Sequence, residues 1–190
     1  MHNQTAHNLQ TLYNQVATLK LLPRTGWLQR GVANPESVAE HTFGVAALAL
    51  LVGDTVAGLD RGKLLAIALL HDMAEALLSD LPASARRLIG ADRKHAAEHQ
   101  ALEEMFARLP NQAEYLALWE DYALGGSPEA RLVKGIDRIE MLVQALAYER
   151  AGSRALTEFW ADIEQGWGDE FPILWDLAAQ LIEMREHLPG

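Results

Sequence analysis

One stretch indicates both the helical fold and the position of a site: Leu64-Leu65-Ala66-Ile67-Ala68-Leu69-Leu70-His71-Asp72-Met73-Ala74-Glu75. Its first seven residues are all apolar, which is typical of a helix that is buried on most of its faces. An imidazole and a carboxylate follow directly, and burying such groups without a partner costs several kcal/mol. We therefore expect either a hydrogen-bond network or a cation beside His71 and Asp72. Glu75 follows at a helical spacing that brings it close to the same patch.

The rest of the sequence has the composition of a helical protein. Ala and Leu make up 61 of the 190 residues, and no window of six residues alternates as a half-buried strand would. We expect an all-α fold, a compact bundle of about eight helices. The expected helices cover about 5–22, 35–56, 61–78, 92–109, 112–124, 128–150, 154–164 and 172–187, with a helical or irregular piece at 83–89.

The second of these helices has two candidate starts. Asn34 can cap a helix that has Pro35 and Glu36 in its first turn, whereas Ser37 and Glu40 can form a capping box three residues later. Both alternatives place His41 near the start of an apolar helix.

Length, charge and cysteine content limit the functions that this sequence can have. A length of 190 residues indicates a single domain over residues 1–190. The net charge of −10 argues against a surface for nucleic-acid polymers or anionic membranes. No apolar run is long enough to span a bilayer and the start does not resemble a signal peptide, so we expect a cytoplasmic protein. With no cysteine, any metal must be bound by His and carboxylate side chains.

Five polar residues interrupt the apolar helices: His41, His71, Asp72, Glu75 and Asp137. Two imidazoles and two carboxylates without a thiolate suit Mn²⁺, Mg²⁺, Co²⁺, iron or Zn²⁺. The alternative is a set of core polar groups that satisfy one another, and spacing alone does not choose between the two.

The order of His41, His71-Asp72 and Asp137 resembles the H…HD…D signature of the HD-domain metal-dependent phosphohydrolases. Four segments over about residues 12–150 are similar to the 5′-deoxynucleotidase branch of that superfamily: Arg24-Thr25-Gly26-Trp27, Pro35 to His41, Leu70 to Pro82, and Ser127 to Met141. The resemblance implies a single all-helical HD domain, with core motifs in 24–141 and C-terminal helices in 154–187 that pack on it.

The resemblance also implies a metal centre and two catalytic carboxylates. One divalent ion is expected on His41, His71, Asp72 and Asp137, with Co²⁺, Mn²⁺ or Mg²⁺ expected first and Zn²⁺, Fe²⁺ or Ni²⁺ as alternatives. Glu75 would orient or deprotonate the attacking water, since a carboxylate one hydrogen bond away can accept its proton. Asp80 would lie at the sugar end and accept a hydrogen bond from the deoxyribose 3′-hydroxyl.

Three further residues are expected to bind the substrate. The resemblance implies that Arg24 and Trp27 contact the nucleotide and sense the absence of a 2′-hydroxyl, since Arg supplies forked donors to phosphate and Trp a flat wall for the sugar. Lys134, one turn before Asp137, would offset phosphate charge. Thr25 and Gly26 separate Arg24 from Trp27, whereas the corresponding residues are adjacent in bacterial enzymes of this branch.

Two other groups of residues are weaker candidates. His95 and His99 share a helix face, but their surroundings are highly charged and favour a solvated surface. Glu120-Asp121 matches a region where the family carries acidic pairs, and surface charge explains it equally well.

Together these features predict a phosphomonoesterase that hydrolyses deoxyribonucleoside 5′-monophosphates to deoxyribonucleoside and phosphate. One alternative keeps the metal but changes the substrate to a cyclic nucleotide, a ribonucleotide or a nucleoside polyphosphate. Another is a non-catalytic helical scaffold with a structural metal. The expected partner is a small nucleotide rather than a nucleic acid or a membrane, and the family resemblance implies a homodimer.

Overall fold

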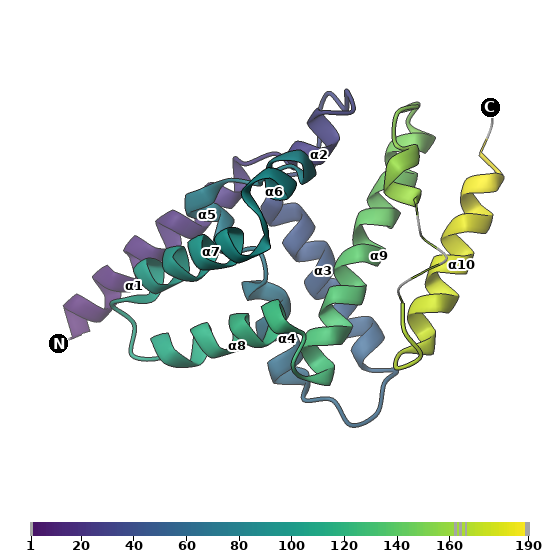
Figure 1. Cartoon of the computed structure of the whole chain (residues 1–190). Coiled ribbons are helices and arrows are strands. Elements are labelled where there is room, and N and C mark those ends of the chain that lie inside the picture. The colour runs from purple at the N-terminus through teal and green to yellow at the C-terminus, as the bar shows by residue number, and fades with distance from the viewer. Residues whose placement is uncertain (1, 162, 164, 166, 189–190) are drawn as a thin grey trace.

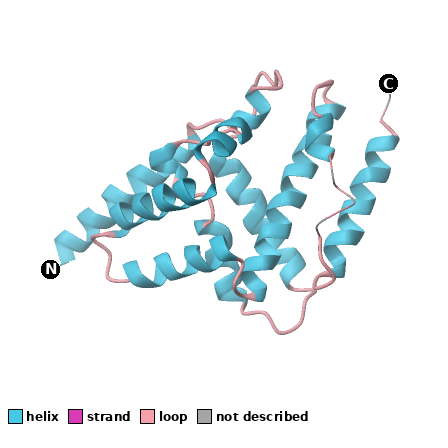
Figure 2. Cartoon of the chain, in the orientation of Figure 1, coloured by secondary structure: helices cyan, strands magenta, loops and turns pink. Residues whose placement is uncertain are grey.

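The computed structural model describes residues 2–161, 163, 165 and 167–188, and this part of the chain contains helices and no strand (Figure 1, Figure 2). The all-α prediction is therefore confirmed. Eight of the described helices have seven residues or more: α1 (His2–Ala17), α3 (Val38–Gly53), α4 (Arg61–Leu70), α6 (Ala83–Ile89), α7 (Ala91–Phe106), α8 (Gln112–Leu124), α9 (Pro128–Arg150) and α10 (Pro172–Glu186). The shorter elements are η1 (Thr18–Lys20), α2 (Thr25–Leu28), α5 (Glu75–Leu78) and η2 (Thr157–Trp160).

Two hydrophobic cores hold these helices together. The larger core lies among α3, α4, α9 and α10, with α9 in contact with the other three helices (Figure 1). The smaller core includes Leu102, Phe106 and Trp119, where α7 packs on α8 and on α5. Leu118 of α8 packs against both cores. Helix α8 therefore lies between the two cores, and side chains of α4, α8 and α9 come close together there.

The structure selects the later of the two predicted starts for the second helix. Ser37 caps α3, because its Oγ accepts a hydrogen bond from the Glu40 backbone N–H at 3.2 Å and the Glu40 carboxylate accepts one from the Ser37 N–H at 2.6 Å. The start at Asn34 is wrong, because residues before Ser37 pair instead with the preceding segment. The Arg24 N–H donates to the Glu36 carbonyl at 2.9 Å, which holds Arg24 beside the start of α3.

The helix expected over residues 61–78 is broken in two, which corrects the sequence prediction. Helix α4 ends at Leu70, and tight turns follow in which the Met73 N–H donates to the Leu70 carbonyl and the Glu75 N–H to the Asp72 carbonyl, both at 3.1 Å. Helix α5 begins only at Glu75. His71 and Asp72 therefore lie in a turn at the end of a buried helix rather than along its side.

Most other expected helices are found close to their predicted bounds, and 83–89, 112–124 and 128–150 match them. The segment 154–164 is an exception, since its described residues contain only η2; residues 162 and 164 lie outside the described part. Among the described helices, none combines the length and hydropathy that a bilayer crossing requires.

Candidate active site

Three helices bring together His41, His71 and Asp137, which are far apart in the sequence. His41 lies in the first turns of α3, His71 caps the C-terminus of α4, and Asp137 lies in the middle of α9. Gly44, on the next turn of α3, faces Glu140 of α9, and a Cβ atom at this glycine would lie 2.5 Å from Glu140 Oε1. The glycine therefore allows α3 to approach α9 closely at the position of His41.

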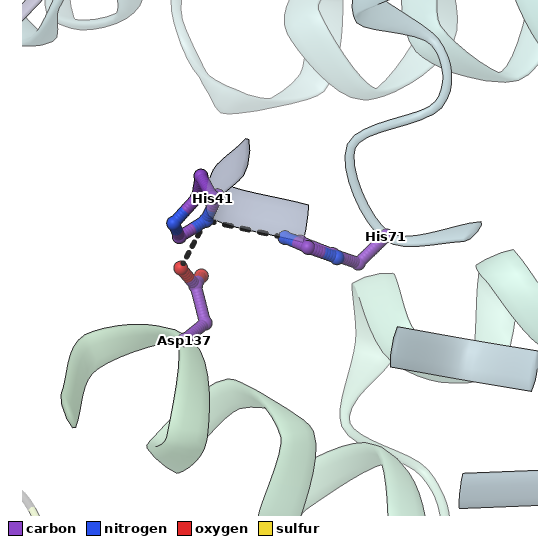
Figure 3. Close-up of side chains that lie close together, drawn as sticks. All are labelled: His41, His71 and Asp137. Carbon is purple, nitrogen blue, oxygen red and sulfur yellow. Dashed lines mark hydrogen bonds and ion pairs between the residues drawn. The ribbon is translucent and has the colours of Figure 1, made fainter. Parts of the chain in front are cut away.

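The three side chains converge on one point (Figure 3). His41 Nε2 lies 3.1 Å from Asp137 Oδ1 and 3.4 Å from His71 Nε2. Both imidazoles are buried, with 0% and 3% of their residue surface exposed. The ligand atoms of all three residues lie within 4.8 Å of one another, as a shared cation requires.

The second nitrogen of each imidazole shows that this cluster fits a metal ion. His71 Nδ1 lies 2.7 Å from the Ala68 carbonyl oxygen, which can only accept, so Nδ1 carries the proton. His41 Nδ1 likewise lies 2.5 Å from Glu140 Oε2 and donates to it. In the neutral rings, each Nε2 then presents a lone pair toward the other, an arrangement that a cation between them stabilises. Metal-binding histidines have their other nitrogen oriented in this way.

The electrostatics of the cluster also favour positive charge at this point. Burial lowers the pKa of His41, but its hydrogen bonds to Asp137 and Glu140 outweigh burial and raise that pKa to about 10. Burial alone would raise the pKa of Asp137, yet the contact with His41 lowers it below the ordinary value. Burial likewise lowers the pKa of His71, but Asp72 and Asp137 outweigh burial and raise that pKa. Without a metal, the carboxylates therefore favour protons on the imidazoles, and a divalent ion can take the place of those protons.

Asp72, the fourth predicted ligand, lies beside this cluster. Its Oδ2 is 3.3 Å from His71 Nε2 and 3.7 Å from His41 Nε2, and it also forms a 2.9 Å ion pair with Arg24 Nη1. Burial would raise the pKa of Asp72, but His71 and Arg24 lower it well below the usual range. The carboxylate is thus charged and shared between the histidines and Arg24, and its role as a metal ligand stays a prediction.

Glu75 is a buried carboxylate with an unsatisfied oxygen. Only 8% of the residue is exposed, and its Oε2 has no hydrogen-bond partner among the described residues. Burial, followed by the charges of Asp72 and Asp80, raises the pKa of Glu75 to about 9. A buried carboxyl oxygen without a hydrogen bond destabilises the fold, and a nearby cation or a bound water would reduce this cost.

The candidate residues line two adjoining cavities. The first, of about 670 Å³, is lined by Glu75 together with His71, Asp72 and Asp137. The second, of about 440 Å³, is lined by Trp27 and Phe159, among others. Arg24, Asp80 and Arg86 line both cavities. Asp80 is positioned at this junction by Thr25, whose backbone N–H donates to Asp80 Oδ2 at 2.5 Å.

Trp27 and Lys134, the other two predicted substrate-binding residues, both have hydrogen-bond partners within the protein. Trp27 is only 2% exposed, because its ring packs against Phe159 and its indole N–H donates to Glu36 Oε1 at 2.8 Å. Lys134 lines the first cavity, but its Nζ donates to the Ala123 carbonyl at 2.9 Å. Neither side chain lies in the metal cluster, and their contacts with a nucleotide stay predictions.

Two residues that the sequence did not single out for a role contact the cluster. Tyr122 donates its hydroxyl to Asp137 Oδ2 at 3.1 Å, and burial raises the pKa of this tyrosine well above its usual value. Glu140 orients His41, as described above. Glu140 lies one turn after Asp137, so its spacing could have indicated it, whereas the Tyr122 contact depends on how α8 packs against α9.

Comparisons with known proteins agree with this geometry. The family model described as "HD domain" matches residues 16–175. The chain is 37% identical to 5′-deoxynucleotidase HDDC2 of Bos taurus, over 78% of this chain and 72% of that protein. It is 35% identical to 5′-deoxynucleotidase hdd1 of Schizosaccharomyces pombe, over 77% and 76% of the two chains. The solved structure of the PH0347 protein from Pyrococcus horikoshii superposes with a TM-score of 0.79 at 35% identity, covering 92% of this chain and 98% of that one. A match over most of the chain, with His41, His71 and Asp137 gathered at one point and Asp72 beside them, means that this protein belongs to the HD-domain family.

Proposed function

We propose that this protein is a metal-dependent phosphomonoesterase that hydrolyses deoxyribonucleoside 5′-monophosphates to deoxyribonucleoside and phosphate. The observation that carries the proposal is the pairing of two imidazole Nε2 atoms with Asp137, next to a buried carboxylate without a partner in the same cavity. The relatives named 5′-deoxynucleotidases support the choice of substrate.

His41, His71 and Asp137, with Asp72 beside them, are the residues that would bind the metal. A divalent ion at this point would polarise a phosphoryl oxygen and lower the pKa of water toward neutral, the two contributions that hydrolysis needs. The donor set contains nitrogen and oxygen only, which suits Co²⁺, Mn²⁺ or Mg²⁺ and leaves Zn²⁺, Fe²⁺ and Ni²⁺ as alternatives. Glu140 and the Ala68 carbonyl keep both imidazoles in the tautomer that exposes Nε2.

Glu75 is the residue that would accept a proton from the attacking water. Its unpartnered Oε2 can accept a hydrogen bond from water in the cavity, and positive charge nearby lowers its raised pKa so that it can act as a base. Arg24 neutralises Asp72 and can turn its remaining donors toward phosphate. Asp80, at the junction of the two cavities, is placed to accept a hydrogen bond from a sugar hydroxyl.

One observation favours a broader substrate range. Because the Trp27 ring is buried and its indole N–H already has a partner, this ring offers little surface for rejecting a 2′-hydroxyl. Ribonucleoside 5′-monophosphates are therefore the second candidate substrates. The single-domain organisation, the homodimer and the cytoplasmic location stay predictions from the sequence.

A nucleotide panel tests the proposal. Purified protein loaded with Co²⁺, Mn²⁺ or Mg²⁺ should release phosphate from deoxyribonucleoside 5′-monophosphates, and Glu75→Gln should retain the metal but lose this activity. If the loaded protein cleaved only cyclic nucleotides or polyphosphates, the proposed substrate would be wrong. If metal binding were normal and no ester were cleaved, a structural scaffold would explain the site instead.

A further inference from the structure

His95 of α7 lines the larger cavity but has no part in the mechanism above. Its ring packs against the buried Trp119, with centroids 5.1 Å apart and an interplanar angle of 31°. Trp119 and Tyr122 are three residues apart on α8 and line the same cavity. Tyr122 in turn bonds to Asp137, so the wall that carries His95 continues to the proposed metal cluster.

His95 lies beside a carboxylate, Glu120, that has one unsatisfied oxygen; both side chains are partly exposed, at 40% and 37%. Glu120 Oε2 lies 3.3 Å from His95 Nε2; it is buried and makes no hydrogen bond within the described part of the chain. A buried carboxylate oxygen without a donor is unfavourable, and an imidazolium at His95 would satisfy it. The neighbouring Asp121 points elsewhere, since it accepts hydrogen bonds from Ser127 and pairs with Lys63.

The other charged groups near His95 belong to the same cavity. Lys94 and Glu98 of α7 form an ion pair with each other, and Lys94 also acts electrostatically on Glu75. His95 therefore lines the cavity that contains the proposed base, and the Glu120 carboxylate lies close enough to pair with its Nε2 when the ring is protonated. Among the described residues, no hydrogen-bond partner is found for Nδ1, the other nitrogen.

We propose that His95 is the general acid of the reaction and that Glu120 positions it; this inference rests on the proposed function. As the water oxygen bonds to phosphorus, the bond between phosphorus and the nucleoside 5′-oxygen breaks, and its electron pair stays on that oxygen. His95 gives its ring proton to the 5′-oxygen, while Glu75 takes the proton that the water loses. The products are deoxyribonucleoside and phosphate, and proton exchange with solvent restores both side chains.

Two esters that differ only in the leaving atom separate an acid from a residue with another role. The first is a deoxyribonucleoside 5′-monophosphate; the second has sulfur in place of its bridging 5′-oxygen, so that a thiolate leaves without needing a proton. We expect His95→Gln to lower kcat on the oxygen ester about 100-fold, a typical contribution of acid catalysis. Its kcat on the sulfur ester should be close to that of the wild type, which also shows that the variant is folded.

His99→Gln is the matched control. His99 lies one turn later on α7 and also contacts Trp119, but it pairs with Glu103 and does not line the cavity. We expect this substitution to change neither rate. Glu120→Gln should reproduce the preference of His95→Gln for the sulfur ester with a smaller loss on the oxygen ester.

Other results would overturn the inference. Equal losses on both esters would make His95 a binding or structural residue, and an unchanged rate on the oxygen ester would remove it from the reaction. p-Nitrophenyl phosphate, whose phenolate also leaves unprotonated, provides the same comparison if the wild type does not cleave the sulfur ester. If the wild type cleaves no deoxynucleotide at all, the proposed function fails, and the role of His95 fails with it.

Discussion

The two sides of the cavity differ in how well their polar atoms are satisfied. On the side of α3, α4 and α9, both nitrogens of His41 and of His71 have neighbours, and Glu140 and the Ala68 carbonyl hold the rings in place. On the side of α5 and α8, Glu75 and Glu120 each have a buried oxygen without a hydrogen bond. The first side therefore has the preorganised ligand atoms that the proposed metal ion requires. On the second side, the Glu75 oxygen is open to water and substrate, and the Glu120 oxygen faces His95.

Removing a ligand from the first side should have the largest effect. Asp137→Asn removes the negative charge beside His41 that attracts a cation. We therefore expect this variant to lose both the bound metal and phosphate release. Elemental analysis measures the metal content, and isothermal titration measures the affinity for the metal. Asp176→Asn, on the exposed face of α10, is the control and should keep both properties. Full metal binding by Asp137→Asn would contradict the assignment of the centre.

On the second side, Glu75→Gln should separate catalysis from metal binding. We expect kcat to fall about 10²- to 10⁴-fold, because the variant lacks the proposed base, while the metal content stays the same. A parallel loss of metal would show instead that Glu75 belongs to the metal-binding side.

The same substitution should change how stability depends on pH in the metal-free protein. Burial raises the pKa of Glu75 from 4.5 in the unfolded chain to about 9, so the folded state binds this proton more tightly. The free energy of unfolding should therefore decrease as pH rises from 4.5 toward about 9, and Glu75→Gln should remove part of that decrease. Urea denaturation of both proteins, freed of metal with a chelator, at several pH values measures this free energy. Identical pH profiles for the two proteins would show that the carboxyl is not buried as described.

Glu140→Gln should have an intermediate effect, through the orientation of His41. The amide is a weaker acceptor for the His41 Nδ1 proton, so metal affinity should fall about 10- to 100-fold. Glu149→Gln is the matched control, because Glu149 is also buried on α9 but pairs with Arg185. It should lower stability and leave metal affinity unchanged. Equal metal affinities in the wild type and Glu140→Gln would remove Glu140 from the centre.

Asp121→Ala should have the smallest effect on activity and sharpen the contrast with Glu120. Asp121 accepts hydrogen bonds from the Ser127 N–H at 2.8 Å and hydroxyl at 2.6 Å, before the start of α9. We expect a loss of about 1–3 kcal/mol in the free energy of unfolding with little change in kcat. Denaturant titration gives the first value and phosphate release the second. A large loss of kcat in a variant that is still folded would place Asp121 in the cavity.

Local signals predicted the helix boundaries best. Gly125 ends α8 in a left-handed conformation, and Ser127 with Pro128 starts α9, so 112–124 and 128–150 are correct. The break after Leu70 carries no proline or glycine and was missed, because packing and the turn at His71 produce it. The position of His95 was missed for a similar reason: only the packing of α7 on α8 turns this histidine toward the cavity.

The most direct test of the account is phosphate release from a deoxyribonucleoside 5′-monophosphate by chelator-stripped protein titrated with Mn²⁺ or Co²⁺. We expect no release from the stripped protein, and release that rises with added metal until about one ion is bound per chain, as for a centre with one set of ligands. Hydrolysis that survives complete removal of metal, or that is absent at every metal concentration, would contradict it.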